Sequence, residues 1–194
     1  MIYIYDFNDS FTYNLFSDLY HYSKVEVIAF KDISNHLNSL LETDDKYVVV
    51  LGPGPGHPDE YEFLTPVITK LLNSENIFTF GICLGHQLIW KNLGMKVKRS
   101  SNPVHGQSEK IEFDKFYSDS TIHSVTMQRY NSLSVNFPSN MLKEFNDQGW
   151  QLVTRDHELL MSRNKNVLTY QFHPESIGSM RKELLYSPVR EFLL

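Results

Sequence analysis

The sequence predicts an α/β fold in which a mostly parallel, open, flavodoxin-like sheet is flanked by helices. Two observations support this prediction. Up to residue 93, short β-rich segments alternate with helical ones, which is the pattern of parallel strands linked by covering helices. After residue 94, short strand-like segments follow one another with turn-like connections. The second half therefore predicts an antiparallel extension of the sheet.

The first half supplies the parallel strands. The run YVVVL at Tyr47–Leu51 is almost wholly apolar, as expected of a strand that is buried on both faces. Asp9 or Ser10 is positioned to cap the helix that follows the first strand. The expected strands span residues 2–5, 25–30, 47–51 and 77–82, and the expected helices span 11–22, 60–72 and 84–93.

The second half supplies the antiparallel strands. Its connections resemble turns, as in the segment NDQG at residues 146–149. The chain has no internal repeat, low-complexity segment or linker, so we expect one domain over residues 1–194. The expected strands span 95–98, 109–113, 122–128, 151–154, 159–162 and 167–172, and a closing helix spans 181–193.

Composition and charge narrow the classes of function. The 194 residues are 41% hydrophobic and 21% charged, an ordinary globular balance. The net charge is −5 and the basic residues form no block, so neither nucleic acid nor a membrane surface is expected as a partner. No stretch approaches the roughly 20 apolar residues of a membrane span, and the N-terminus does not resemble a signal peptide. The single cysteine, Cys83, indicates a reducing, cytoplasmic setting.

Cys83 lies in the segment G-I-C-L-G at residues 81–85, between an apolar strand and an amphipathic helix. This arrangement is typical of a nucleophile elbow, in which flanking glycines allow a strand to turn sharply into a helix. The turn places the sulfur above the carboxyl ends of the strands, where open α/β sheets bind ligands. The helix N-terminus favours the thiolate. A lone cysteine is more often a small buried hydrophobe, but its context here favours a nucleophile.

A thiolate nucleophile needs a base and a group that orients the base. The segment H-P-E at residues 173–175 directly follows the last expected strand. Pro174 disfavours helix at the residue before it, so His173 should be extended. Side chains two positions apart then point to the same side, and Glu175 can fix the imidazole tautomer. We therefore predict a Cys83–His173–Glu175 triad, although H-P-E alone would be more typical of a surface turn with an incidental ion pair.

An acyl-transfer site also needs donors for the developing oxyanion. The backbone N–H of Leu84, directly after the nucleophile, is one expected donor. The second is expected in the loop after Tyr47–Leu51, where Pro53 and Pro55 lack an N–H and Gly54 lies between them. The loop lacks the Lys-Ser/Thr ending of a phosphate-binding loop.

The other histidines offer no comparable site. His86 falls in the first turn of the helix after Cys83 and is expected to face away from the sulfur. No group of His, Asp and Glu has the spacing of a metal site. We therefore expect no metal and no cofactor in this chain.

Together these segments resemble the class I, triad-type glutamine amidotransferases. G-I-C-L-G-H-Q at residues 81–87 is similar to the nucleophile motif of that family, and H-P-E is similar to its His–Glu pair. Over essentially the full length, the resemblance narrows to the small subunit (component II) of anthranilate synthase and of para-aminobenzoate (aminodeoxychorismate) synthase. The segments that carry it are N-D-S-F-T-Y-N-L at 8–15, P-G-P at 53–55 with P-D-E at 58–60, H-G at 105–106, R-Y at 129–130 with S-L at 132–133, and Q-F-H-P-E-S-I at 171–177.

The resemblance implies a reaction and a partner. Cys83, His173 and Glu175 would hydrolyse glutamine to glutamate and ammonia. The ammonia would pass to a larger chorismate-binding synthase subunit (component I) of tryptophan or folate-precursor biosynthesis. The resemblance also assigns residues to the oxyanion site and to glutamine binding: Pro53, Gly54, Pro55, Leu84, Gln87, Ser132 and Leu133.

The sequence departs from the family pattern in two places. Asn131 replaces the His of R-Y-H-S-L, which bears on the glutamine pocket, and residues 61–63 lack the usual small residues, which bears on the subunit contact. Two alternatives stay open: a different triad hydrolase or an amidotransferase of another biosynthetic branch, and a catalytically silent regulatory or scaffold subunit. The segment at 8–15 argues against the first, and the intact triad residues argue against the second. The sequence does not decide between the tryptophan and folate branches.

Overall fold

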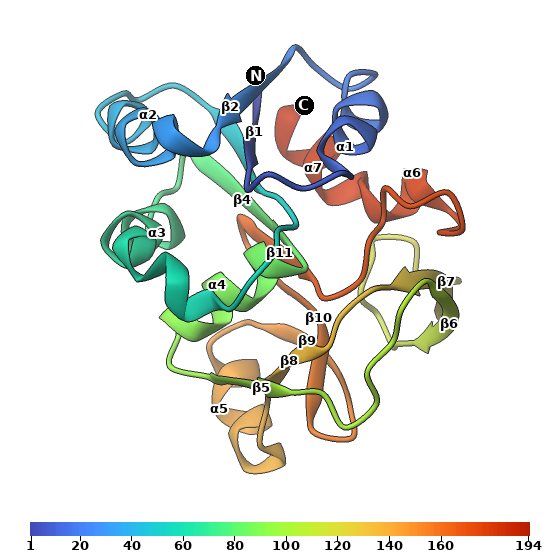
Figure 1. Ribbon diagram of the computed structural model, residues 1–194. Helices are drawn as coiled ribbons and strands as arrows, with labels where there is room; N and C mark the ends of the chain where they lie inside the picture. The colour runs from blue at the N-terminus through green and yellow to red at the C-terminus, as the bar shows by residue number, and fades with distance from the viewer.

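A computed structural model describes all 194 residues and contains one nine-stranded sheet (Figure 1). Neighbouring strands follow the order β2-β1-β3-β4-β11-β10-β8-β5, and β9 pairs with β10. The parallel strands are β1 (Ile2–Asp6), β2 (Val25–Ala29), β3 (Tyr47–Leu51), β4 (Ile77–Ile82) and β11 (Val167–Tyr170). The antiparallel extension consists of β5 (Lys96–Arg99), β8 (Leu133–Asn136), β9 (Gln151–Arg155) and β10 (Glu158–Asn164). The predicted fold class is confirmed.

Helices cover both faces of the sheet (Figure 1). One face carries α2 (Ile33–Leu40), α3 (Thr65–Leu72) and α4 (Leu84–Asn92), and α5 (Leu142–Asp147) extends this layer. The other face carries α1 (Thr12–Leu19), α6 (Lys182–Leu185) and α7 (Ser187–Leu193). Short 3-10 segments lie at Phe30–Asp32, Pro58–Leu64 and Ser139–Met141.

The parallel strands are buried on both faces, and β3 shows why its sequence is continuously apolar. Val48 and Val50 pack into the core layer beneath α1 and α7, whereas Val49 and Leu51 pack into the layer beneath α2, α3 and α4. Successive side chains of a strand point to opposite faces, so a strand covered on both sides needs an apolar residue at every position.

Two of the expected strands do not join the main sheet. β6 (Gln107–Glu112) and β7 (Ser124–Arg129) pair with each other as a separate antiparallel ribbon. The ribbon buries Ile111, Val125 and Met127 in the core layer of α1 and α7. The expected extension of the main sheet by these two segments is therefore wrong, because their apolar face packs on the side of the sheet and not along its edge.

Prolines interrupt both of the longer helices expected from the sequence. The expected helix over 60–72 is a 3-10 segment up to Leu64 followed by α3, with Pro66 in the first turn of α3. The expected closing helix over 181–193 divides into α6 and α7, with Pro188 in the first turn of α7. Proline lacks an N–H and clashes with the preceding turn, so it starts helices more readily than it continues them.

The expected cap of the first helix is also different in the structure. α1 begins after Phe11, and no side chain caps it. The Asp9 carboxylate instead accepts a hydrogen bond from the backbone N–H of Phe11, the residue before the helix, at 2.8 Å. Three elements had no counterpart in the prediction, namely α2, α5 and β8.

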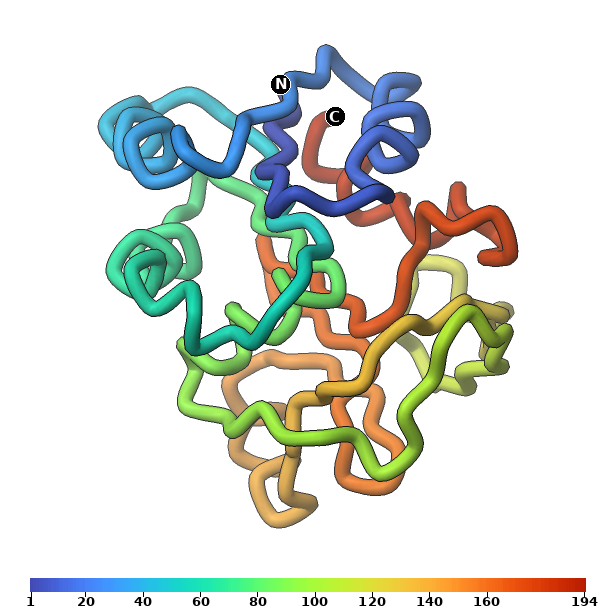
Figure 2. The backbone as a smooth tube through the Cα atoms, viewed as in Figure 1, coloured from blue at the N-terminus to red at the C-terminus, as the bar shows by residue number.

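The backbone path brings the C-terminal segment beside the first helix (Figure 2). Lys182 in α6 contacts the carboxylate of Asp18 in α1 at 2.8 Å, and Tyr186 donates to the same carboxylate at 3.0 Å. The loop after β11 is thereby held at the carboxyl ends of the parallel strands. None of the helices is both long and apolar enough to cross a membrane.

Candidate functional site

Cys83 lies at the junction of β4 and α4 in a strained backbone conformation. Its φ is +50° and its ψ is −98°, although φ values above zero are uncommon for residues with a side chain. The Cys83 N–H donates to the carbonyl oxygen of Tyr170 in the neighbouring strand β11 at 2.8 Å. Such strain costs of order 1–3 kcal/mol and persists where the surroundings enforce it, often at functional sites. The predicted elbow is present.

The glycines on either side of Cys83 are required by close packing. A Cβ atom on Gly81 would lie 2.6 Å from the side chain of Ile89 in α4. A Cβ atom on Gly85 would collide with the backbone carbonyl of Leu51 in β3. The helix can therefore start directly above the strands only because both positions lack a side chain.

His173 and Glu175 meet as predicted from their spacing. The imidazole Nδ1 lies 2.7 Å from the Glu175 carboxylate, and the two residues are only 3% and 1% exposed. His173 Nε2 and the second carboxylate oxygen of Glu175 are buried and make no hydrogen bond. A buried polar atom without a partner is costly, but His86 Nε2 shares this feature, so the position of His173 beside Cys83 is what indicates a role in chemistry.

Electrostatics link His173 to Cys83. Burial alone would lower the pKa of His173, but a neighbouring Cys83 thiolate and then the Glu175 carboxylate raise that pKa well above its usual value. The imidazolium is therefore the favoured form beside a thiolate. A thiolate–imidazolium pair provides a nucleophile and a proton donor at the same position.

Two aromatic rings hold the imidazole in place. The ring centroids of Phe11 and Tyr130 each lie 5.1 Å from that of His173. The backbone N–H of His173 donates to the carbonyl oxygen of Gln128 at 3.0 Å. Phe11 lies in the loop between β1 and α1, whose two ends are joined where Asp6 accepts a hydrogen bond from Thr12 at 2.7 Å.

A hollow of about 190 Å³ opens above Cys83. It brings together residues from three separated segments of the chain, so the predicted glutamine-binding residues largely meet around the sulfur. Pro53 is the exception, because it is buried and does not line the hollow. The lining residues are Gly54, Pro55, Gly56, Cys83, Leu84, Gln87, Tyr130, Asn131, Ser132 and Leu133.

Gly54 lies directly against the elbow. A Cβ atom at this position would come within 2.6 Å of the Leu84 side chain and of the Phe7 side chain. The two predicted oxyanion donors therefore belong to backbone segments in contact. An oxyanion site needs two N–H groups close together, and this contact is compatible with that requirement.

Several residues of the site were not identified from the sequence. Gln171 donates from Nε2 to the Cys83 sulfur at 3.8 Å and is fully buried. A signal for it existed, because Gln171 lies two positions before His173 in an extended segment. Phe11 and Tyr130 had no such signal, since only the folded chain brings them to the imidazole.

His86 faces away from the sulfur, as expected. Its Nδ1 lies 2.7 Å from the hydroxyl of Thr169 in β11, and the residue is fully buried. No cluster of three or more His, Cys, Asp or Glu side chains is positioned to hold a metal ion.

Known proteins of similar sequence identify the family of this chain. The family model described as "Glutamine amidotransferase class-I" matches residues 3–191. Anthranilate synthase component 2 of Haemophilus influenzae is 31% identical, over 96% of this chain and 94% of the relative. Aminodeoxychorismate/anthranilate synthase component 2 of Bacillus subtilis is 32% identical, over 95% of this chain and 93% of the relative.

Solved structures extend the agreement to the fold. A glutamine amidotransferase from Thermotoga maritima superposes with a TM-score of 0.70 at 16% identity, covering 99% of this chain and 95% of that one. The family match spans nearly the whole chain, including the elbow and the H-P-E segment. This chain therefore belongs to the class I glutamine amidotransferase family.

Proposed function

We propose that this protein is the glutamine-hydrolysing component of a two-subunit synthase and that Cys83, His173 and Glu175 form its catalytic triad. The observation that carries the proposal is the buried imidazole of His173. Its Nδ1 is bonded to Glu175, and Cys83 lies close enough to the ring to raise its pKa. This arrangement supports nucleophilic attack followed by proton transfer.

In the first half of the reaction, the Cys83 thiolate attacks the side-chain amide carbon of glutamine. The carbonyl oxygen becomes an oxyanion, which the backbone N–H groups of Gly54 and Leu84 stabilise. The His173 imidazolium donates its proton to the amide nitrogen, the C–N bond breaks, and ammonia leaves. A glutamyl thioester on Cys83 and a neutral imidazole remain.

In the second half, the neutral His173 takes a proton from water as the water oxygen attacks the thioester carbon. The C–S bond breaks, glutamate leaves, and the thiolate and imidazolium are restored. Glu175 keeps the ring in one tautomer and stabilises its charged form. Gln87, Ser132 and Leu133, with the proline–glycine loop at residues 53–55, hold the amino-acid end of glutamine.

The ammonia released is used by a second protein. Two relatives with matching length are named as component 2 of a synthase, and one of these names covers both anthranilate and aminodeoxychorismate. We infer that this chain delivers ammonia to a larger, chorismate-using subunit in the cytoplasm. The product is anthranilate, aminodeoxychorismate, or both, according to the subunit that binds.

The test combines the purified chain with candidate chorismate-using subunits. Glutamate release is measured with and without each subunit, and the aromatic product is identified. We expect hydrolysis to rise in the complex, because ammonia released without an acceptor is lost. Equal rates with and without every subunit would contradict the assignment of a synthase partner.

The Cys83→Ala variant tests the triad itself. Glutamine-dependent synthesis should be lost while ammonia-dependent synthesis by the partner is retained. Equal loss of both activities would show that Cys83 serves assembly. A glutamine-like alkylating agent provides an independent check, because modification at Cys83 is expected of an enzyme and not of a silent scaffold.

A further inference from the structure

A chain of hydrogen-bonded amides begins at the nucleophile. Gln171 Nε2 donates to the Cys83 sulfur at 3.8 Å, and Gln171 Oε1 accepts from Gln87 Nε2 at 3.2 Å. Both glutamines are almost fully buried. The side chain of Gln171 is thus oriented from behind, with its N–H groups directed at the sulfur.

The chain continues to the edge of the hollow. Gln87 Nε2 also donates to the backbone carbonyl of Leu133 at 3.0 Å, and Asn131 Nδ2 donates to the same carbonyl at 3.0 Å. A backbone carbonyl only accepts, so both amides must present their NH₂ groups to it. Leu133 and Asn131 line the hollow, which joins the amides around the sulfur to the wall where glutamine is expected.

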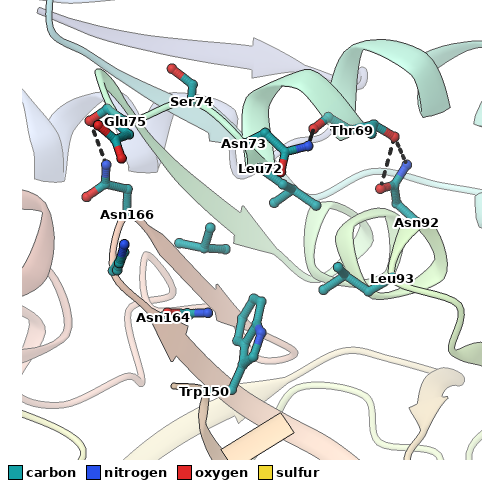
Figure 3. Close-up of a pocket in the computed structure, with 12 residues that line it drawn as sticks. Thr69, Leu72, Asn73, Ser74, Glu75, Asn92, Leu93, Trp150, Asn164 and Asn166 are labelled. Carbon is teal, nitrogen blue, oxygen red and sulfur yellow. Dashed lines mark hydrogen bonds between the residues drawn. The ribbon is translucent and has the colours of Figure 1, made fainter. Parts of the chain in front are cut away.

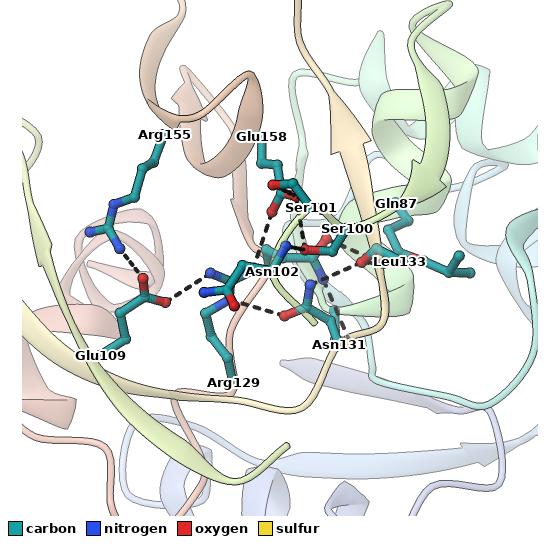
Figure 4. Close-up of polar contacts among 12 residues, drawn as sticks. Gln87, Ser100, Ser101, Asn102, Glu109, Arg129, Asn131, Leu133, Arg155 and Glu158 are labelled. Carbon is teal, nitrogen blue, oxygen red and sulfur yellow. Dashed lines mark hydrogen bonds and ion pairs between the residues drawn. The ribbon is translucent and has the colours of Figure 1, made fainter. Parts of the chain in front are cut away.

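Arg129 fixes the far end. Its Nε donates to Asn131 Oδ1 at 3.0 Å, and its two terminal nitrogens bind Glu109 at 2.8 Å and Glu158 at 3.3 Å (Figure 4). The arginine is only 2% exposed. A guanidinium only donates hydrogen bonds, so Asn131 can have one orientation, with its oxygen toward Arg129 and its nitrogen toward Leu133.

The wall of the hollow is held at further points. The carbonyl of Asn131 accepts from the N–H of Val104 at 3.1 Å, and the carbonyl of Ser132 accepts from the N–H of Ser100 at 2.9 Å. With the Leu133 carbonyl, three successive carbonyls of this segment are occupied. The segment is therefore fixed on its protein side before any substrate arrives, which is the requirement for precise positioning.

We propose that Asn131, Gln87 and Gln171 form an amide relay with two separate positioning ends, one at the nucleophile and one at the wall of the glutamine pocket, joined through Gln87. Gln171 is the positioning residue at the sulfur, where its N–H favours the thiolate. Asn131 is the positioning residue at the wall, where its side chain is oriented by Arg129 and holds the Leu133 carbonyl. Hydrogen bonds to an ionised group stabilise that form, so the Gln171 end should influence reactivity and the Asn131 end should influence binding.

This proposal rests on the glutaminase function, and its two ends are tested by different measurements. The variants are Gln171→Leu and Asn131→Leu, which remove the amide with little change in volume. Asn92→Leu is the matched control. Asn92 is the last residue of α4, its amide donates to Thr65 and Thr69 of α3, and it does not line the hollow above Cys83. Each variant is assayed for glutamine hydrolysis in the presence of the synthase subunit, for thermal unfolding, and for alkylation of Cys83 by iodoacetamide.

The two variants should affect different quantities. Gln171→Leu should slow alkylation by about tenfold near neutral pH, which corresponds to about 1.4 kcal/mol, and should shift the pH profile of alkylation upward. Asn131→Leu should raise the KM for glutamine about tenfold and leave kcat and alkylation unchanged, because iodoacetamide does not use the pocket wall. Asn92→Leu should change neither quantity.

A purely structural role would give another result. If both variants lower the unfolding temperature as Asn92→Leu does and change hydrolysis and alkylation no more than it does, the relay has no positioning role. If Asn131→Leu slows alkylation as strongly as Gln171→Leu, the separation of the two ends is wrong. Alkylation needs no glutamine, so it still tests the sulfur end if glutamine hydrolysis is never observed, and failure of the relay is thereby distinguished from failure of the enzyme.

Discussion

The hollow above Cys83 and a second hollow at the opposite ends of the strands differ in their polar groups as well as in volume. The second hollow encloses about 510 Å³ near the start of β4 and β11, compared with about 190 Å³ above Cys83 (Figure 3). Its lining contains four asparagines but no cysteine or histidine. Of these two hollows, it would be the preferred binding site by size alone.

The difference lies in which polar atoms are already used. In the larger hollow, the Asn73, Asn92, Asn164 and Asn166 side chains all donate hydrogen bonds to the protein itself, as Figure 3 shows for Asn73, Asn92 and Asn166. At the catalytic edge, His173 Nε2 and an oxygen of Glu175 are buried without partners. His86 Nε2 and Thr79 Oγ1 are also buried without partners, so capacity for chemistry follows the His173–Glu175 pair beside the strained Cys83 backbone, and not the size of the cavity.

The largest expected effect tests this contrast directly. His173→Gln should lower glutamine hydrolysis by about 10²–10⁴-fold, the usual contribution of a general acid–base group. Asn166→Ala, which removes a polar group of the larger hollow, should leave hydrolysis unchanged. Steady-state glutamate release in the presence of the synthase subunit measures both.

The contrast would fail in either of two ways. Hydrolysis by His173→Gln within the range of the wild-type protein would remove the histidine from the chemistry. A large loss in Asn166→Ala, with unchanged unfolding temperature, would give the opposite hollow a role in the reaction.

Most of the site could be predicted because its chemistry is encoded locally. The glycines around Cys83 and the extended H-P-E segment each act within a few residues, so spacing alone predicted the elbow and the His173–Glu175 contact. Gln171 obeys the same alternation rule and could have been identified. Arg129 could not, because its role depends on Glu109 and Glu158, which only the folded sheet brings to it.

The same difference between local and long-range features explains which elements of the fold were predicted. Strands were recognised from their apolar patterns, but the assignment of β6 and β7 to the main sheet failed because pairing depends on distant partners. α2 was not predicted because its sequence, ISNHLNSL, mixes Ser, Asn and His, which are indifferent helix formers. Burial of Ile33, Leu37 and Leu40 on one face stabilises it in the fold.

The next prediction concerns Arg129. The catalytic edge contains this buried charge, whereas the asparagine side chains that line the larger hollow are neutral amides. Arg129→Met should lower the free energy of unfolding by about 3 kcal/mol, since it leaves Glu109 and Glu158 without their cation. Chemical denaturation measures the change. A variant as stable as the wild-type protein would mean that solvent or Arg155, which also contacts Glu109, already compensates these carboxylates.

Two buried histidines give the third test, through opposite pKa shifts. Burial lowers the pKa of His86 to about 3, whereas the pKa of His173 is raised because Cys83 and Glu175 outweigh its burial. In the unfolded chain both would titrate near a pKa of about 6.5. As the pH falls from 7 to 5, His86 is protonated in the unfolded state but not in the folded state. The free energy of unfolding therefore falls by about 2 kcal/mol.

His173 has the opposite sign. Its raised pKa contributes stability that is fully present below about pH 6.5 and is lost as pH rises through the folded-state pKa. We therefore expect His86→Gln to become relatively more stable than the wild-type protein as the pH is lowered from 7 to 5, and His173→Gln to become relatively less unstable as the pH is raised above 6.5. Denaturation curves at successive pH values measure both differences, and slopes of equal sign would contradict the opposed environments.

The smallest expected effect concerns the larger hollow alone. Asn92 donates to the Thr65 carbonyl and to the Thr69 hydroxyl, each at 3.0 Å, and so ties the end of α4 to α3. Asn92→Leu should lower the free energy of unfolding by about 1 kcal/mol, the net contribution of such hydrogen bonds, while glutamine hydrolysis stays at the wild-type rate. Cys83 lies at the other end of α4, so this variant tests whether loosening the C-terminal end of the helix changes the activity of Cys83. A fall in activity larger than the fall in stability would show that the two ends of α4 are coupled, and the separation between a structural hollow and a chemical one would no longer hold.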